Sequence, residues 1–303
     1  MSEIEVVVVR LTDDAGHRGW GEERVYPRYG ESAESVIGAI EAVRALVEGG
    51  CGRDELVDAM PGGAARNALD CALLDLEAKT SACTVYELLD LAQPKPALVT
   101  YTIGLGSPET MAADAKAAGR PLLKLKLGGE GDLDRVRAVR EAVPEARLIV
   151  DANEAWTLAM VREWGAPMAA LGVELIEQPL HADHDEGLAG IERPVPLCAD
   201  ESCHGPDSLE RLVGRYDMIN IKLHKAGGLT TALRLAEAAE ARGLGIMVGC
   251  MMATSLAMAP AFVLSSRTRY LDLDAPLLLA RDREPPIRYA GAMMQPPPVE
   301  LWG

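Results

Sequence analysis

Short apolar runs recur at regular intervals along the last two-thirds of the chain, and Ala-, Leu-, Glu- and Arg-rich stretches separate them. The runs have the length of strands, and the stretches between them have the composition of helices. Eight strands alternating with helices predict a (β/α)8 barrel, although the spacing also suits an open, doubly wound sheet. The runs are Leu98–Ile103, Leu122–Leu127, Leu148–Val150, Val173–Ile176, Pro196–Ala199, Met218–Ile221, Gly245–Val248 and Tyr270–Leu273.

The N-terminal part of the chain follows a different pattern. Glu5–Leu11 is apolar and β-branched, and Asp13–Gly16 has the composition of a turn, so a hairpin is expected there. Two helical patterns follow, over Glu34–Val47 and Pro61–Lys79. Prolines at positions 94 and 96 then mark a boundary. We therefore expect an α+β domain over residues 1–95, a barrel over residues 96–285, and a C-terminal segment, residues 286–303, that packs back on the first domain.

Charged residues end most of the predicted strands. The carboxyl ends of barrel strands form the active-site face. A parallel strand is buried on both faces, so an unpaired charge at its end is costly. One such charge alone would be a solvated loop start or a structural ion pair, but a closed barrel brings five consecutive strand ends together, which favours the barrel over the open sheet. The charges are Lys124 and Lys126, Asp151, Glu177, Asp200, Lys222, and Asp272 and Asp274 on the eighth run.

The three central charges are the carboxylates Asp151, Glu177 and Asp200. Three carboxylates that converge on one point cannot all stay ionised without a cation. Oxygen ligands without His or Cys favour a hard ion, so we expect Mg²⁺, with Mn²⁺ as the alternative. In the competing interpretation each carboxylate pairs with a neighbouring lysine and no metal binds.

The lysines lie on the second and sixth predicted strands, which face each other across a closed barrel. Lys124 and Lys126 are two residues apart and point to the same side. Their mutual repulsion, together with that of the metal, is expected to lower the pKa of at least one amine, so that it acts as a base at about pH 8. The metal would neutralise the enediolate that forms when a proton leaves the carbon next to a carboxylate.

Nine sequence strings resemble the enolase superfamily, in its muconate-lactonising-enzyme subgroup, from about Glu5 almost to the end of the chain. The superfamily strings are LKLKLG, VDANEAW, IEQPL, ADESCHG, INIKLHKAGGLT and GCMMATS. LDLDAP, YPRYGES and PGGAARNALDCALLDL are similar to the bacterial L-Ala-D/L-Glu (dipeptide) epimerases within the subgroup. The resemblance implies a (β/α)7β modified TIM barrel with an N-terminal α+β capping domain.

The resemblance also implies roles for individual residues in proton transfer. Asp151, Glu177 and Asp200 would be the Mg²⁺ ligands. Lys126 and Lys222 would be the opposed acid/base pair, one for each face of the substrate's α-carbon. Lys124 would help to hold the substrate carboxylate and tune Lys126.

Other residues would bind the substrate. Asp272 and Asp274 would bind the ammonium of a dipeptide's first residue, whereas the alternative is an ordinary loop turn before Pro276. The remaining candidates are Thr102, Cys250 and Met251 in the pocket wall, and Arg28 in the YPRYGES loop of the cap.

The match breaks at the beginning of the chain. Relatives have a further strand and a mobile loop before the VVVV strand, and this sequence opens with Met1, Ser2 and Glu3. That loop closes over the substrate and supplies a cation for its side-chain carboxylate. Either the start is assigned too late or the protein works without this lid, in which case water exclusion and substrate choice change. His224, between Lys222 and Lys225, is interpreted as incidental.

Three functions are compatible with these residues. The first is a dipeptide epimerase that inverts the second residue in the metabolism of cell-wall peptides. The second keeps the fold and changes the reaction to that of an N-acylamino-acid racemase, an o-succinylbenzoate synthase or a cycloisomerase. Those substrates lack a free ammonium, so the Asp272/Asp274 pair favours the first. The third is a truncated, inactive metal-binding barrel.

The formal charge of −16 argues against nucleic acids and anionic membrane surfaces as partners. Six scattered cysteines without a C-x-x-C pair indicate reduced thiols. The chain has no secretion signal and no apolar run of about 20 residues, so a soluble, cytoplasmic enzyme that acts on a small molecule is expected. The oligomeric state is left open, and a homo-oligomer is compatible with the sequence.

Overall fold

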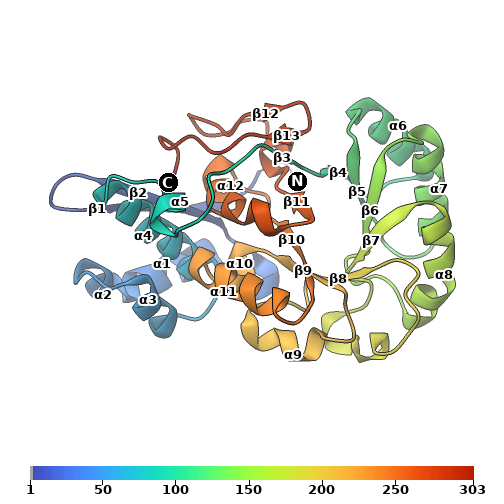
Figure 1. Cartoon of the computed structure of the whole chain (residues 1–303), viewed down its shortest axis with the longest axis horizontal. Helices are drawn as coiled ribbons and strands as arrows, with labels where there is room; N and C mark the ends of the chain where they lie inside the picture. Colours follow the sequence, from blue (N-terminus) through green and yellow to red (C-terminus); the bar gives the residue numbers. More distant parts are fainter. Residues whose placement is uncertain (1–2) are drawn as a thin grey trace.

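A computed structural model describes residues 3–303 of the chain. Its main sheet has eight parallel strands in the order β11-β10-β9-β8-β7-β6-β5-β4 (Figure 1). Val99 forms a parallel bridge with Leu271, and the Thr100 amide donates to the Leu271 carbonyl at 2.9 Å, so the first and last strands meet. The sheet is therefore a closed barrel and not an open, doubly wound sheet. The strands are β4 (Tyr101–Ile103), β5 (Leu122–Lys126), β6 (Arg147–Asp151), β7 (Val173–Glu177), β8 (Leu197–Ala199), β9 (Met218–Ile221), β10 (Gly245–Gly249) and β11 (Tyr270–Asp272).

The interior of the barrel has an apolar layer below a charged one. Side chains two residues apart on a strand point to the same face, so each inward apolar residue is followed two positions later by an inward polar residue or glycine. On β5 these are Leu122 and Lys124, and on β6 they are Ile149 and Asp151. The apolar layer is fully or almost fully buried and consists of Leu122, Ile149, Leu175, Cys198, Met218, Met247 and Tyr270.

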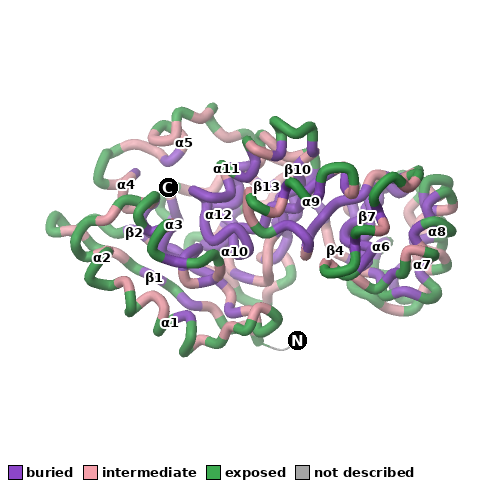
Figure 2. The backbone as a smooth tube through the Cα atoms, turned by 90° about the horizontal axis from the view of Figure 1, so that it is seen from below, coloured by how far each residue is buried: buried purple, intermediate pink, exposed green. Residues whose placement is uncertain are grey.

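Helices cover the outside of the barrel (Figure 1). Their buried faces pack on the strands, as the burial along the backbone in Figure 2 shows. No helix within residues 3–303 has the length and apolar character needed to cross a membrane. The helices after the barrel strands are α6 (Pro108–Ala118), α7 (Asp132–Ala142), α8 (Leu158–Ala170), α9 (Leu209–Leu212), α10 (Leu223–Ala226), α11 (Leu229–Glu240) and α12 (Ser255–Phe262).

The cap is built from the predicted hairpin and a helical layer. Strands β1 (Val6–Thr12) and β2 (Arg18–Arg24) pair in antiparallel register. They pack on α4 (Ala64–Thr80), and the approach is so close that a Cβ on Gly21 would lie 2.0 Å from the Ala68 carbonyl oxygen. The other cap elements are η1 (Pro27–Tyr29), α1 (Ala33–Ala42), α2 (Arg44–Glu48), α3 (Arg53–Ala59) and α5 (Val85–Leu88).

Two expected helix bounds in the cap are wrong. The single helix expected over residues 34–47 is divided at Val43, whose φ of −102° and ψ of 7° leave the helical region. The second begins at Ala64 rather than Pro61, because Gly63 has a φ of +135° that only glycine adopts readily.

The C-terminal segment lies against both domains. Strands β12 (Tyr289–Ala290) and β13 (Met293–Met294) form a small sheet with β3 (Ala97–Leu98). The Trp302 indole then donates to the Cys71 carbonyl of α4 at 3.0 Å, and the chain end lies beside α5 (Figure 1).

The cap docks on the barrel at the glycine pair that follows α10. The Arg66 guanidinium of α4 donates to the carbonyls of Ala226 at 2.7 Å and Gly227 at 2.8 Å. The Asp70 carboxylate accepts from the Thr230 amide at 3.0 Å. A Cβ on Gly228 would lie 2.5 Å from the Asp70 carboxylate, so the AGGLT string leaves the space into which α4 fits.

We predict that Gly228→Ala lowers the free energy of unfolding by about 2 kcal/mol or more, because it combines a φ of +124° with a clash against Asp70. Gly243→Ala is a matched control, since its φ is +74° and nothing lies within 4 Å of the added methyl. We expect Gly243→Ala to lower the free energy of unfolding by about 1 kcal/mol, from the left-handed backbone alone. Thermal melting of both variants checks this, and equal losses would show that the close approach to Asp70 contributes nothing.

Candidate active site

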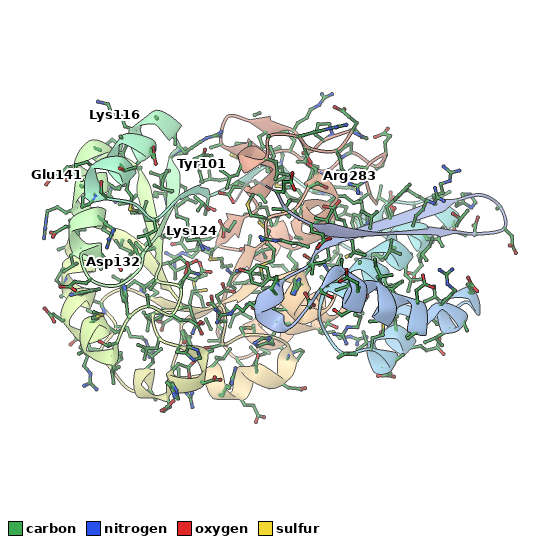
Figure 3. All side chains as sticks on the ribbon, turned by 180° about the vertical axis from the view of Figure 1, so that it is seen from behind. Tyr101, Lys116, Lys124, Asp132, Glu141 and Arg283 are labelled. Carbon is green, nitrogen blue, oxygen red and sulfur yellow. The ribbon has the colours of Figure 1, made fainter. Side chains whose placement is uncertain are left out.

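A cavity of about 410 Å³ lies at the carboxyl ends of the barrel strands, beneath the cap. Figure 3 shows Lys124 towards the middle of the molecule, whereas Lys116 of α6 lies at the outer edge. The cavity brings together both domains and most of the residues expected to act in it. It is lined by Arg24, Tyr26, Arg28, Tyr29, Thr102, Lys124, Lys126, Asn153, Asp200, Glu201, Lys222, Cys250, Met251, Met252, Asp272, Asp274, Ala275 and Leu278.

The Lys124 amine is surrounded by carboxylates. Its Nζ lies 2.7 Å from Glu177 Oε2, 2.8 Å from Asp272 Oδ2 and 3.2 Å from Asp151 Oδ2. The side chains of Lys124, Asp151 and Glu177 are at most 2% exposed. Charges that are scattered over 149 positions of sequence, from 124 to 272, therefore meet in one buried cluster.

The two lysines expected to move the proton are each paired with one of the same carboxylates. Lys126 Nζ, at the end of β5, lies 2.6 Å from Asp151 Oδ2. Lys222 Nζ, directly after β9, lies 2.6 Å from Asp200 Oδ2. Because β5 and β9 are the second and sixth strands of an eight-strand ring, the two amines approach the cavity from opposite sides.

The carboxylates differ strongly in their affinity for protons. Burial and the charge of Asp151 raise the pKa of Glu177 to about 8, against the attraction of Lys124. Burial also acts to raise the pKa of Asp151, but Lys126 and Lys124 outweigh it and hold that pKa at about 2. The cluster therefore has more negative charge than its lysines can neutralise.

This excess of negative charge fits a divalent cation. Asp151, Glu177 and Asp200 offer oxygen ligands only, which suits Mg²⁺. Within residues 3–303, no group of three ligating side chains is already spaced to hold a metal ion. The Lys124 amine contacts both Asp151 and Glu177 and neutralises part of their charge.

Carboxylates dominate the surroundings of both Lys124 and Lys222. Burial acts to lower the pKa of Lys124, but Asp272, Glu177 and Asp151 outweigh it and raise that pKa well above its ordinary value. The pKa of Lys222 is likewise raised, because Asp200 and Glu177 outweigh the effect of burial. The expected lowering of the pKa of Lys124 or Lys126 depends also on the repulsion of a bound metal ion, so it stays a prediction.

Asp272 and Asp274 both face the cavity, but in different surroundings. Asp272 is held by Lys124 and by the Thr100 hydroxyl. Asp274 Oδ2 accepts from the Thr102 amide at 2.7 Å, and burial together with Asp272 raises the pKa of Asp274 to about 6. No lysine or arginine ion pair forms with Asp274 within the described chain, so this carboxylate is suited to a cationic ligand.

The cap contributes more to the cavity than the sequence indicated. Arg28 lines it as expected, with its guanidinium bound to Glu154 from the loop after β6. The same loop holds Asn153 and Glu154 in the left-handed region, at φ +42° and +67°, which turns the VDANEAW string towards the cap. Tyr29, from the same YPRYGES loop as Arg28, also lines the cavity. The cavity residues that the sequence did not indicate are Arg24, Tyr26, Asn153, Glu201, Met252, Ala275 and Leu278.

Two further polar residues support the carboxylate cluster. Asn220 Nδ2 donates to Glu177 Oε1 at 2.8 Å, and Lys225 Nζ lies 2.6 Å from Asp200 Oδ1. The two-residue alternation on β9 could have identified Asn220, because it shares a face with Met218 and Lys222. Lys225 lies within α10, where no strand period predicts its direction.

The interpretation of His224 as incidental is wrong. Its ring is only 3% exposed and lies between two carboxylates of the cap, with Nδ1 3.4 Å from Glu23 Oε1 and Nε2 3.2 Å from Glu31 Oε2. The sequence around His224 gives no sign of these contacts, because Glu23 and Glu31 lie about 200 residues earlier in the same chain.

Comparison with known proteins gives the same family along the whole chain. Residues 109–299 match the enolase C-terminal domain-like family, and residues 1–90 match the mandelate racemase/muconate lactonizing enzyme N-terminal domain. The L-Ala-D/L-Glu epimerase of Escherichia coli is 45% identical over 95% of this chain and 90% of that protein. The N-acetyl-D-glutamate racemase of Pseudoalteromonas sp. is 42% identical over 98% of this chain and 95% of that protein.

A solved structure agrees with these sequence matches. An enolase family member from Agrobacterium tumefaciens with homology to dipeptide epimerases, solved with sodium and L-Ala-L-Glu, has a TM-score of 0.94 and 46% identity, and the match covers 99% of both chains. The capped barrel, its carboxylate and lysine cluster and the match of both domains lead to one conclusion: the chain belongs to the enolase superfamily, in the mandelate racemase/muconate lactonizing enzyme family.

Proposed function

We propose that this isomerase is a dipeptide epimerase of the L-Ala-D/L-Glu type, which inverts the α-carbon of the second residue. One observation carries the proposal: opposed lysines and a pair of buried aspartates line a single cavity. Lys126 and Lys222 approach from opposite sides, and Asp274 adds a carboxylate without a lysine or arginine partner in the described chain. A dipeptide has the matching groups, an acidic α-proton beside a carboxylate and a free ammonium.

Asp151, Glu177 and Asp200 are the residues that would hold Mg²⁺. A dipeptide epimerase from Enterococcus faecalis has been solved in complex with Mg and L-Leu-L-Tyr. When bound, the ion supplies positive charge beside the substrate carboxylate, which makes the α-proton more acidic. Mn²⁺ suits the same oxygen ligands.

The lysines perform the proton transfer. One amine takes the α-proton, the electron pair delocalises into the carboxylate as an enediolate, and the opposed ammonium returns a proton to the other face. Because Lys126 and Lys222 exchange these roles between the two epimers, both directions of the reaction use the same pair. Lys124 would hold the substrate carboxylate.

The ammonium of the first residue would bind at the aspartates of β11. Asp274 is nine-tenths buried and partnered by a backbone amide, so a cation there gains a charge-assisted contact away from water. Arg28, Thr102, Cys250 and Met251 line the remaining wall and would contact the rest of the dipeptide.

Proton exchange in D₂O tests the proposal. The purified protein with Mg²⁺ is expected to add one deuterium to the second residue of L-Ala-L-Glu and to produce L-Ala-D-Glu, both followed by mass spectrometry and chiral chromatography. A pooled L,L-dipeptide library in the same assay identifies the preferred side chains. Absence of exchange with every dipeptide, although Mg²⁺ binds, would refute the proposal.

A second candidate is an N-acylamino-acid racemase, which the 42% identity to the N-acetyl-D-glutamate racemase favours. N-acetyl-L-glutamate in the same D₂O assay distinguishes the two. Exchange on N-acetyl-glutamate without exchange on L-Ala-L-Glu would assign the racemase reaction instead.

A further inference from the structure

His224 links the barrel to the part of the cap that lines the cavity. It lies two residues after Lys222, at the start of α10, and is buried between Glu23 of β2 and Glu31. The two carboxylates are themselves largely buried, at 6% and 15% exposure. A barrel side chain with two carboxylates of the cap around it is an interdomain contact rather than part of the carboxylate cluster.

Glu31 also binds the backbone of the cap. Its Oε2 accepts from the Tyr26 amide at 3.1 Å, and its Oε1 accepts from the Ala64 amide at the start of α4 at 2.9 Å. Glu23 accepts in addition from the Asn67 side chain. His224 therefore touches the two carboxylates that hold the loop of residues 26–31 to α4.

The same loop packs directly on the ring. The Tyr29 and His224 ring centroids are 5.4 Å apart, and those of Tyr26 and His224 are 6.2 Å apart. Tyr26, Arg28 and Tyr29 line the cavity from the cap side. The imidazole thus contacts this cavity wall from the barrel side, as Glu154 does through Arg28.

The ring is charged at neutral pH. Neither nitrogen has the geometry of a hydrogen bond, so the attraction to the carboxylates is mainly between whole charges. Burial acts to lower the pKa of His224, but Glu23 and Glu31 outweigh it and raise that pKa to about 9. The titratable groups that face the ring are Glu23, Glu31, Tyr26 and Tyr29 from the cap, and Lys222 and Lys225 from its own segment.

We propose that His224 is a positioning residue, which fixes the 26–31 loop on the barrel through Glu23 and Glu31 and thereby sets the affinity for substrate. The loop itself would contact the substrate, while the lysines do the chemistry. Only the kinetic part of this inference rests on the proposed epimerase function, because the fixing of the loop is a property of the protein without substrate.

Hydrogen exchange of the intact protein tests the fixing of the loop. In His224→Gln the protection of the peptide that covers residues 26–31 is expected to fall about five-fold or more at pH 7, because a neutral side chain no longer attracts the two carboxylates. Glu23→Gln, which removes the charge from the cap side, should have the same effect. His204→Gln is the matched control, since this exposed imidazole meets the same Tyr29 ring at 6.0 Å without a carboxylate ion pair.

The pH dependence separates charge from packing. The folded pKa of His224 is raised from its ordinary 6.5 to about 9, so the stabilisation is complete below about pH 6.5 and is lost as pH rises from there through about 9. The protection of the wild-type loop, corrected for the intrinsic exchange rate, should fall over that range and approach that of His224→Gln. The loop protection of His224→Gln should show no such fall over this pH range.

Kinetics on L-Ala-L-Glu test the effect on affinity. We expect KM to rise about ten-fold in His224→Gln and kcat to change less than about two-fold, since Lys126 and Lys222 remain in place. Unchanged loop protection in His224→Gln, or a loss of kcat at unchanged KM, would overturn the inference. If no dipeptide is turned over, the epimerase proposal fails, and the exchange comparison still decides whether His224 fixes the loop.

Discussion

Alanine at either Lys126 or Lys222 is expected to reduce epimerisation of L-Ala-L-Glu by about 10³-fold or more, because each variant lacks the proton donor or acceptor on one face of the α-carbon. The two variants should differ in which epimer's α-proton they still exchange. The surviving amine can still remove and return the proton on its own side, so each variant exchanges the α-proton of one epimer in D₂O. The geometry predicts that Lys126→Ala and Lys222→Ala retain exchange on opposite epimers.

The control for this experiment is Lys116→Ala, which removes a lysine of similar chemistry from α6, outside the cavity. Lys116→Ala should epimerise L-Ala-L-Glu at the wild-type rate. Stabilisation of each variant by Mg²⁺, measured as a rise in melting temperature, shows that the carboxylate cluster still binds the ion. Exchange of both epimers by either single variant would mean that one amine serves both faces, contrary to the opposed arrangement across the barrel.

The sequence predicts the barrel and the meeting of the charged side chains at its carboxyl end well, because both depend on local patterns. A strand period of two places Leu122, Lys124 and Lys126 on one face, and the same period pairs Ile149 with Asp151. A series of such strands, each apolar below and charged above, can meet only at one end of a closed sheet. The bridge between Val99 and Leu271 confirms that closure.

Contacts between the domains could not be predicted in the same way. His224 and Glu23 are separated by 201 positions, from 23 to 224, and neither has a local pattern that identifies its partner. The carboxylates around Lys124 could not be counted from the sequence for a related reason, since the pKa of a buried amine depends on every charge nearby and not on sequence neighbours. The end of α1 at Val43 could not be predicted either, because the helical period of the sequence continues across Val43 while its backbone conformation ends the helix.

We expect the carboxylate of Asp274 to bind the substrate ammonium, and Asp274→Asn tests this role more cleanly than Asp272→Asn does. Asp272 accepts from Lys124 at 2.8 Å and from the Thr100 hydroxyl, so changing it would also disturb the buried lysine. Asp274 accepts from the Thr102 amide, and an asparagine can keep that bond through its carbonyl oxygen. Asp274→Asn therefore removes one negative charge with little other change.

We expect Asp274→Asn to raise KM for L-Ala-L-Glu by about 30-fold, equivalent to a charge-assisted contact of about 2 kcal/mol with the substrate ammonium. N-acetyl-L-glutamate, which has no ammonium, is the matched control, and Asp274→Asn should leave its rate of deuterium exchange unchanged. In the wild type, KM for the dipeptide should rise as pH falls through about 6, because protonation of Asp274 removes the same charge. Equal losses on both substrates would show that Asp274 maintains the cavity wall rather than binding an ammonium, and the preference for dipeptides would then have to come from the cap.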